Sequence, residues 1–233
     1  IRLSLVGSEM CIRDSIGMDS DCLIQAGADL EQLTWMDVRV GNYLPTPRHG
    51  KPVEINAYWY NDLEIMKQFA LLQQDNELAQ HYAELADKVK EAFLLKFWNE
   101  EENCLKDVLS ENSEENQVRC NQVWVLSMPY TMLPKEKELC VLHKIKEELY
   151  TTAGLRTLSP KDSAFHDIYI GSMQERDRAY HQGTVWAFPL GAYYRAWIKY
   201  LRQDASDKTS AYKAELAEGI EAIRYWLEEG CLG

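Results

Sequence analysis

Helical stripes of apolar residues, separated by long polar loops, constrain the fold of this chain most. From Glu77 to about Trp98, apolar side chains recur every three or four positions, at Leu78, Tyr82, Leu85, Val89, Phe93 and Phe97. This spacing places them on one face of a helix, and that face must be buried against a neighbouring element. The rest of the segment is charged, so we expect this helix in an outer layer.

Other segments show the same periodicity. A helix is predicted from Val53 to about Leu72, and Asn76 is expected to cap the helix that follows. Further helices are expected over the ranges 117–131, 135–150, 184–202 and 206–229. The polar stretch 99–116 predicts a hairpin or ordered loop, and 151–182 predicts a long loop, which is often functional. Because no fixed repeat length links the helices, a tetratricopeptide solenoid is disfavoured.

The alternation of helix types predicts the architecture. Each pair combines a more apolar helix, suited to burial on most sides, with a more charged one suited to an outer layer. A toroid of helical hairpins produces this pattern, and its long loops build a site at one end. We therefore expect an all-α fold over residues 16–233, an incomplete (α/α)6 toroid with about three helical hairpins.

Composition narrows the classes of function. The chain has 233 residues, 46% of them hydrophobic, and a net charge of −12. This charge repels a phosphate backbone, so nucleic acid is a poor partner, whereas a neutral polymer fits. No apolar run is long enough to cross a bilayer, and the His and Cys spacings suit no metal site. We expect no metal, no cofactor, no membrane contact, and free thiols in a reducing cytoplasm.

The aromatic content allows two interpretations. The chain has 7 Trp and 13 Tyr, which is many for its length. These rings build either a core of large side chains or a carbohydrate site, in which they stack on the C–H faces of sugars. Composition alone favours the core.

The two ends differ from the middle of the chain. Residues 1–15 resemble the translation of a transposase sequencing adapter, so we expect them to be foreign to the fold. At the other end, Gly230 follows an amphipathic helix and predicts a turn that leads onward.

Four groups of segments are too polar and too aromatic at once for plain core or plain surface. They read LTWMD at 33–37, TPRHGKPVEINAYWYN at 46–61, RCNQ at 119–122, and GLRTLSP at 154–160 with YHQGTVW at 180–186. Together they resemble the signature segments of glycogen debranching enzymes in their amylo-alpha-1,6-glucosidase domain. They occur in the same order, over roughly Thr34 to Trp197. The family often has Pro directly after the residue that matches Trp186; here the proline is Pro189, which predicts a shifted helix start.

The resemblance implies a function. Members of this family have an (α/α)6 toroid and hydrolyse single alpha-1,6-linked glucose stubs on glycogen or limit dextrin, with inversion at the anomeric carbon. Two kinds of alternative remain open. One is a glucoamylase-like or trehalase-like hydrolase, or an inverting phosphorylase, on the same fold, and the other is a non-catalytic helical protein that binds glucan.

Asp37 is the candidate general acid. Inverting hydrolysis needs two carboxyl groups, one protonated and one ionised. Asp37 follows Trp35 and Met36, which are expected to form an apolar wall that keeps its carboxyl protonated. The alternative is an Asp that caps the next turn, but the match to the family's WMD motif favours the acid. In the family the base is a Glu that follows the equivalent of Leu227–Gly233, so we expect this chain alone to lack hydrolase activity.

Substrate contacts are assigned to the polar and aromatic residues of the four groups. They are Trp35, Arg48, Glu54, Asn56, Trp59, Asn61, Arg119, Asn121, Gln122, Arg156, Tyr180, His181, Gln182 and Trp186. Some have structural alternatives: Glu54 is also a favourable charge at a helix start, and Trp59 also suits the core. His181 and Gln182 are expected at a helix start, facing a cavity.

Overall fold

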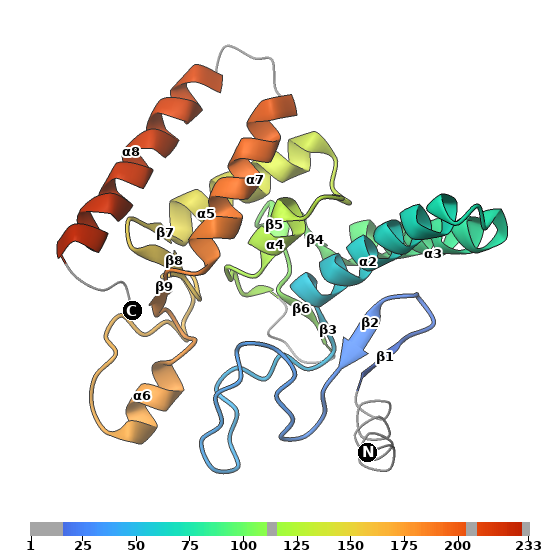
Figure 1. Ribbon diagram of the computed structural model, residues 1–233. Coiled ribbons are helices and arrows are strands. Elements are labelled where there is room, and N and C mark those ends of the chain that lie inside the picture. The colour runs from blue at the N-terminus through green and yellow to red at the C-terminus, as the bar shows by residue number, and fades with distance from the viewer. Residues whose placement is uncertain (1–15, 111–115, 204–208, 230–233) are drawn as a thin grey trace, which may run out of the picture.

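The computed structural model describes residues 16–110, 116–203 and 209–229. Segment 1–15, predicted to be foreign to the fold, lies outside the described residues. Within them the chain is mostly helical, and the long loop between β2 and β3 lies with the segment that carries α6 below the other helices (Figure 1).

The first hairpin matches its prediction. Helix α2 (Val53–Leu72) packs along α3 (Asn76–Phe97), and the tip of the pair projects from the body (Figure 1). Of the predicted stripe of α3, Val89, Phe93 and Phe97 are buried, whereas Leu78 is 39% exposed. The N-cap is Asp75 rather than Asn76, because the Asp75 carboxylate accepts a hydrogen bond from the backbone N–H of Leu78 at 3.0 Å.

The remaining helices differ from their predictions mainly at their ends. They are α4 (Gln122–Ser127), α5 (Lys135–Glu148), α6 (Met173–Ala179), α7 (Pro189–Gln203) and α8 (Thr209–Glu229). Helix α4 is shorter than the predicted 117–131, because Met128 precedes a proline and is extended, with φ −69° and ψ 154°. Helix α7 begins at Pro189, which confirms the shifted start and places proline at the favoured first position.

The helices are arranged as neighbouring pairs. Helix α4 contacts α2 on one side and α7 on the other, while α3 and α5 pack outside them. Helix α8 lies beside α7 (Figure 1) and is anchored through Tyr212, whose ring centroid is 4.9 Å from that of Trp197. Apart from the short α6, the described helices form three successive pairs, α2 with α3, α4 with α5, and α7 with α8, as predicted.

Short antiparallel strands, which an all-α fold lacks, correct the prediction. They pair as β1 (Ile16–Met18) with β2 (Ile24–Ala26), β3 (Lys51–Pro52) with β6 (Val108–Leu109), β4 (Trp98–Asn99) with β5 (Cys104–Leu105), and β7 (Tyr150–Thr151) with β8 (Gly154–Arg156) and then β9 (Val185–Trp186). The predicted hairpin in 99–116 is thus confirmed. The predicted loop 151–182 instead contains a strand and α6, because elements this short leave no periodic signal.

Local chemistry accounts for these two unpredicted elements. Ser172 and Glu175 form a capping box that starts α6. Gly154 lets β8 approach β9, since a Cβ atom there would lie 2.3 Å from the carbonyl oxygen of Trp186.

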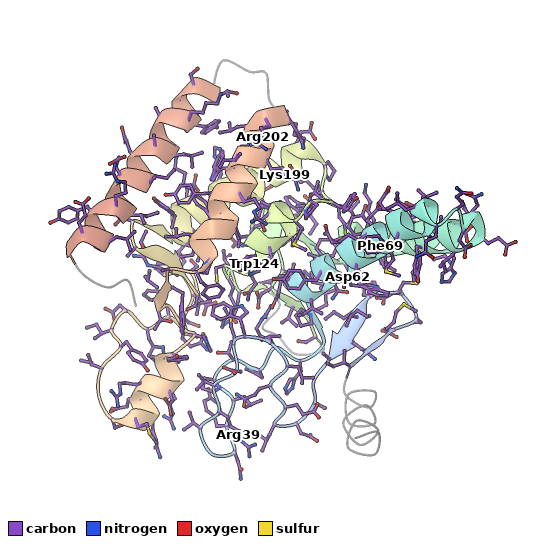
Figure 2. All side chains as sticks on the ribbon, viewed as in Figure 1. Arg39, Asp62, Phe69, Trp124, Lys199 and Arg202 are labelled. Carbon is purple, nitrogen blue, oxygen red and sulfur yellow. The ribbon has the colours of Figure 1, made fainter. Side chains whose placement is uncertain are left out.

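One face of α2 carries exposed apolar side chains. Phe69, which is 53% exposed, and Leu72, which is 79% exposed, lie on it with Ile65 and Met66. Figure 2 shows Phe69 on α2 and Trp124 on α4, both on the side that faces the viewer. None of the helices among the described residues has the length and apolar character needed to cross a membrane.

Candidate functional site

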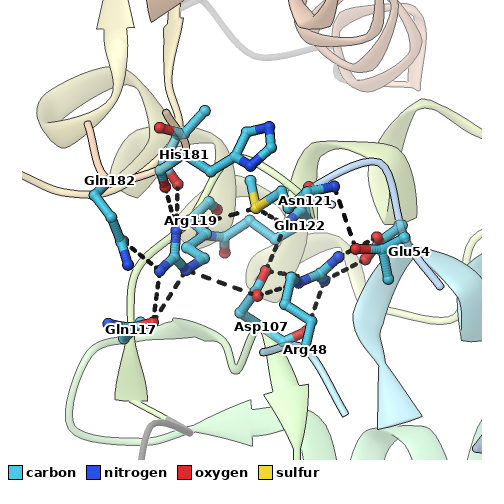
Figure 3. Close-up of polar contacts among 12 residues, drawn as sticks. Arg48, Glu54, Asp107, Gln117, Arg119, Asn121, Gln122, His181 and Gln182 are labelled. Carbon is cyan, nitrogen blue, oxygen red and sulfur yellow. Dashed lines mark hydrogen bonds and ion pairs between the residues drawn. The ribbon is translucent and has the colours of Figure 1, made fainter. Parts of the chain in front are cut away.

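Polar side chains from four distant segments meet beside the N-terminal end of α2 (Figure 3). They come from the loop before α2, the segment between β5 and β6, the residues that lead into α4, and the turn after α6. All of them except the half-buried Gln117 are buried, so their donors and acceptors must find partners within the protein.

Arg48 is the centre of one half of this network. Its Nε donates to Asp107 Oδ2 at 2.6 Å, and its Nη2 donates to Glu54 Oε2 at 2.6 Å. Its Nη1 bonds the other oxygen of Glu54, which makes that pair bidentate. Burial disfavours the charged guanidinium, but Asp107 and Glu54 outweigh it and raise the pKa of Arg48. Glu54 also lies in the first turn of α2, where a negative charge is favoured.

Arg119 is the centre of the other half. Its Nη1 donates to the carbonyl oxygen of His181 at 2.7 Å, and its Nη2 donates to Gln182 Oε1 at 2.7 Å. The guanidinium also donates to Gln117 Oε1, from Nε at 3.0 Å and from Nη2 at 2.8 Å. Burial lowers the pKa of Arg119, and nearby Arg48 lowers it further. Arg119 therefore fixes the turn that carries His181 to the segment that leads into α4.

Asn121 joins the network to an aromatic side chain. Its Nδ2 donates to Asp107 Oδ1 at 2.8 Å, and its Oδ1 accepts a hydrogen bond from Trp35 Nε1 at 2.7 Å. Trp35 is half-buried, whereas Asn121 is fully buried. The indole is thereby fixed at its edge while part of the ring stays accessible.

Aromatic rings gather around Trp35. The ring centroids of Phe188, His181 and Trp186 lie 4.9, 5.2 and 5.8 Å from that of Trp35, each in an edge-to-face arrangement. Tyr180 contacts His181 at 4.8 Å and Trp186 at 5.3 Å. We call Trp35, Tyr180, His181, Trp186 and Phe188 the aromatic cluster. All but His181 keep part of their surface exposed.

His181 is the buried member of the aromatic cluster. It is 1% exposed, and its Nδ1 has no hydrogen-bond partner. Burial lowers the pKa of His181 to about 4, with the charges of Arg119 and Arg48 contributing. It is therefore a neutral imidazole at pH 7. It lies in the turn between α6 and β9 rather than at a helix start, which corrects the prediction.

Asp37 lies outside the network. Its side chain is exposed, whereas Met36 is buried with its Sδ near Asn121 and Arg119. The backbone carbonyl of Asp37 accepts a hydrogen bond from the Gln32 side chain. The apolar wall predicted around Asp37 is therefore not formed, because the neighbouring side chain points into the protein.

Several predicted substrate residues bond to the backbone instead. Asn56 bonds the N–H and C=O of Ile24 at 2.7 and 3.0 Å, which ties β2 to α2. Asn61 does the same with Tyr130, at 2.9 Å for both bonds.

Trp59 and Gln122 are also tied to the backbone. Trp59 Nε1 donates to the carbonyl of Cys22 at 3.1 Å. Gln122 accepts from the N–H of Leu105 at 3.2 Å and donates to the carbonyl of Arg119 at 3.1 Å. For Trp59 this bond agrees with its structural alternative, and Gln122 joins the β5 strand to the residues that lead into α4.

Arg156 lies apart from the buried network. It is half-buried on β8 and lines a cleft of 520 Å³ together with Phe165, Tyr169 and Thr184. Tyr169 also contacts Tyr180, with ring centroids 5.9 Å apart, so the cleft borders the aromatic cluster.

Sequence reasoning missed Asp107, Gln117 and Phe188. Asp107 is 3% exposed and bonds both Arg48 and Asn121. A signal for it exists in the sequence, because it is an acid flanked by Leu105, Val108 and Leu109 in an otherwise polar stretch.

Among the described residues, no group of three or more His, Cys, Asp or Glu side chains is placed to hold a metal ion.

Comparison with known proteins finds distant relatives. One relative is the mannosyl-oligosaccharide glucosidase of Saccharomyces cerevisiae, 26% identical over 184 residues, which cover 71% of this chain and 21% of the relative. The chain thus spans about a fifth of that protein.

A solved structure described as a sialidase superposes with a TM-score of 0.60 and 16% identity, covering 82% of this chain and 16% of that one. At this identity the likeness concerns the fold alone. The family described as amylo-alpha-1,6-glucosidase matches residues 6–233, a range that includes part of the segment predicted to be foreign. The chain therefore belongs to the amylo-alpha-1,6-glucosidase family of glycoside hydrolases.

Proposed function

We propose that this chain carries the sugar-binding and acid-donating part of a glucosidase that removes alpha-1,6-linked glucose from glycogen or limit dextrin. The observation that carries the proposal is the aromatic cluster around Trp35, two residues before Asp37. A partly exposed indole, held at its edge by Asn121, offers a rigid apolar face next to a polar network. Glucose presents the same combination, apolar C–H faces bordered by hydroxyls.

Asp37 is proposed as the general acid. Its exposed side chain can be reached by the glycosidic oxygen of a bound branch. The buried network then supports the site from behind, with Arg119 holding the turn of His181 and Gln182. Inverting hydrolysis also requires a carboxylate that activates water on the opposite sugar face, about 6.5–9.5 Å from the acid. We assign no described residue to that role.

The relative from yeast supports a second candidate. A mannosyl-oligosaccharide glucosidase acts, by its name, on glucose attached to a mannose-containing oligosaccharide. If this chain shares that substrate class, it would prefer a glucosylated oligomannose over a branched glucan.

Binding measurements distinguish the candidates. The 233-residue chain is titrated with a maltooligosaccharide that carries one alpha-1,6-linked glucose, with a linear maltooligosaccharide of equal size, and with a glucosylated oligomannose. The proposal predicts the tightest binding for the branched glucan. Equal binding of the two glucans would contradict it, and preference for the oligomannose would support the second candidate.

Two variants locate the site. Trp35→Ala should weaken binding of the branched glucan about tenfold, or ~1.4 kcal/mol. Trp98→Ala is the matched control, because Trp98 is half-buried beside Lys137, with its ring 4.0 Å from the Lys137 ammonium, and lies outside the aromatic cluster. An equal loss in both variants would show a general effect on folding.

The acid is tested by glucose release from the branched glucan. Two proteins are assayed, the 233-residue chain and the same chain extended with the C-terminal segment of a homologue. The extension is included because no described residue is assigned as the base. Asp37→Asn should lower the rate of the extended protein by about 10²–10⁴-fold, the usual contribution of general acid catalysis. An unchanged rate would remove Asp37 from that role.

A further inference from the structure

We propose that Asp107 is a positioning residue that sets the orientation of Trp35 through the side-chain amide of Asn121. The orientation of Trp35 is inferred from the hydrogen bonds alone. The effect of that orientation on sugar affinity rests on the proposed function. We call the hydrogen-bonded chain from Asp107 through Asn121 to Trp35 the relay. Figure 3 shows Asp107 and Asn121 next to each other, with Arg48 beside Asp107.

The directions of two hydrogen bonds determine the orientation of the Asn121 amide. Asp107 Oδ1 accepts from Asn121 Nδ2 at 2.8 Å, and Asn121 Oδ1 accepts from Trp35 Nε1 at 2.7 Å. A carboxylate only accepts hydrogen bonds and an indole N–H only donates, whereas an amide has one end of each kind. Turning the amide by half a turn would set two acceptors against each other at one end and two donors at the other. The carboxylate therefore selects the amide orientation that Trp35 requires.

Asp107 is itself held at several points. Arg48 donates to its Oδ2 at 2.6 Å, and Arg119 Nε lies 4.0 Å from the same oxygen. Its backbone carbonyl accepts from the N–H of Val53, the first residue of α2, at 2.9 Å. The carboxylate thus sits at a fixed place between the start of α2 and the loop that leads into α4.

Burial prevents water from replacing the hydrogen bonds of the relay. Asp107 is 3% exposed and Asn121 is 0% exposed, so water cannot replace either partner. Trp35 is only half-buried and meets Phe188, His181 and Trp186 edge-on. Packing on a half-exposed ring permits more than one rotation, and the bond to Asn121 selects one of them. Asp107 thereby determines which face of the indole a ligand meets.

The test reads Trp35 directly. In the full ¹⁵N-labelled chain, the indole N–H signal of Trp35 is identified by its loss in Trp35→Phe. In Asp107→Asn, positions 107 and 121 both carry amides, and either orientation becomes possible. The Trp35 signal should then shift or split.

An exchange variant restores the direction of the bonds. In Asp107→Asn with Asn121→Asp, the amide at position 107 donates to the carboxylate at position 121. The second oxygen of that carboxylate accepts from Trp35, so the signal should return to a single position near that of the wild type. Asn121→Leu keeps Asp107 but removes the amide that links it to Trp35. The Trp35 signal should therefore shift in this variant, which can be measured even if Asp107→Asn does not fold.

Glu54→Gln is the matched control. It removes a carboxylate from the same Arg48 but touches neither Asn121 nor Trp35, so the Trp35 signal should stay in place. A purely structural role for Asp107 predicts lower melting temperatures with an unchanged Trp35 signal. An unchanged signal in Asp107→Asn or in Asn121→Leu, or an equal shift in Glu54→Gln, would overturn the inference.

Sugar affinity separates this inference from the proposed function. With the branched maltooligosaccharide, Asp107→Asn should raise the Kd about tenfold, and the exchange variant should recover most of the loss. If the wild type does not bind the glucan, the proposed function fails, and the indole signal alone decides the inference. If Asp107→Asn shifts the signal but binds as tightly as the wild type, the consequence for sugar binding is refuted.

Discussion

Replacing His181 should remove an acid-sensitive part of the stability of this protein. Burial, with help from Arg119 and Arg48, lowers the pKa of His181 from 6.5 to about 4. The unfolded chain takes up a proton below pH 6.5, but the folded chain does so only below about pH 4. Stability from this residue is therefore complete above pH 6.5 and is lost as the pH falls toward 4. A shift from 6.5 to about 4 corresponds to about 3 kcal/mol.

The measurement compares urea unfolding of three proteins between pH 7.5 and 4. His181→Phe keeps a ring in the aromatic cluster but cannot titrate, and His181→Gln serves if the larger ring is not accepted. His166→Phe is the control, because His166 is exposed. Carboxylates titrate in all variants and cancel when the curves are subtracted. The free energy of unfolding should fall by about 3 kcal/mol more in the wild type and His166→Phe than in His181→Phe. Parallel curves for the wild type and His181→Phe would refute the reasoning.

Three further predictions concern the supports of the site. Asn56→Ala leaves the N–H and C=O of Ile24 without their partner and should cost about 1–3 kcal/mol in urea unfolding; an unchanged midpoint would show that the link between β2 and α2 is dispensable. Gly154→Ala places a methyl group against the carbonyl of Trp186 and should cost about 1–3 kcal/mol, whereas a stable variant would mean that β8 and β9 separate easily. Ser172→Ala removes one side of a capping box and should speed hydrogen exchange of the α6 amides by about fivefold, equivalent to ~1 kcal/mol; equal exchange rates would contradict it.

The sequence by itself determined the long helices. Apolar residues at helical spacing identified α2 at Val53–Leu72 within a residue, because an apolar stripe is a local property that any compact fold must bury. It also singled out three segments of the candidate site, the loop before α2, the residues that lead into α4 and the turn after α6, since their mixture of polar and aromatic residues suits neither core nor surface. It missed the fourth, the segment between β5 and β6. Short elements escaped it: β7, β8 and α6 are too brief for a periodic signal.

Only the tertiary structure decided which of the singled-out residues are exposed and which are buried. Asn56 and Asn61 are as polar in the sequence as any sugar-binding residue, yet the fold places each against the backbone of a distant segment. Asp107 and Asn121 meet because the segment between β5 and β6 and the residues that lead into α4 come together beside the start of α2. Hydrogen-bond partners so far apart in the chain leave no local pattern, because their pairing depends on how the helices and strands pack. For that reason only the packing decided that Arg48, Glu54 and Asp107 are buried while Trp35 keeps part of its surface exposed.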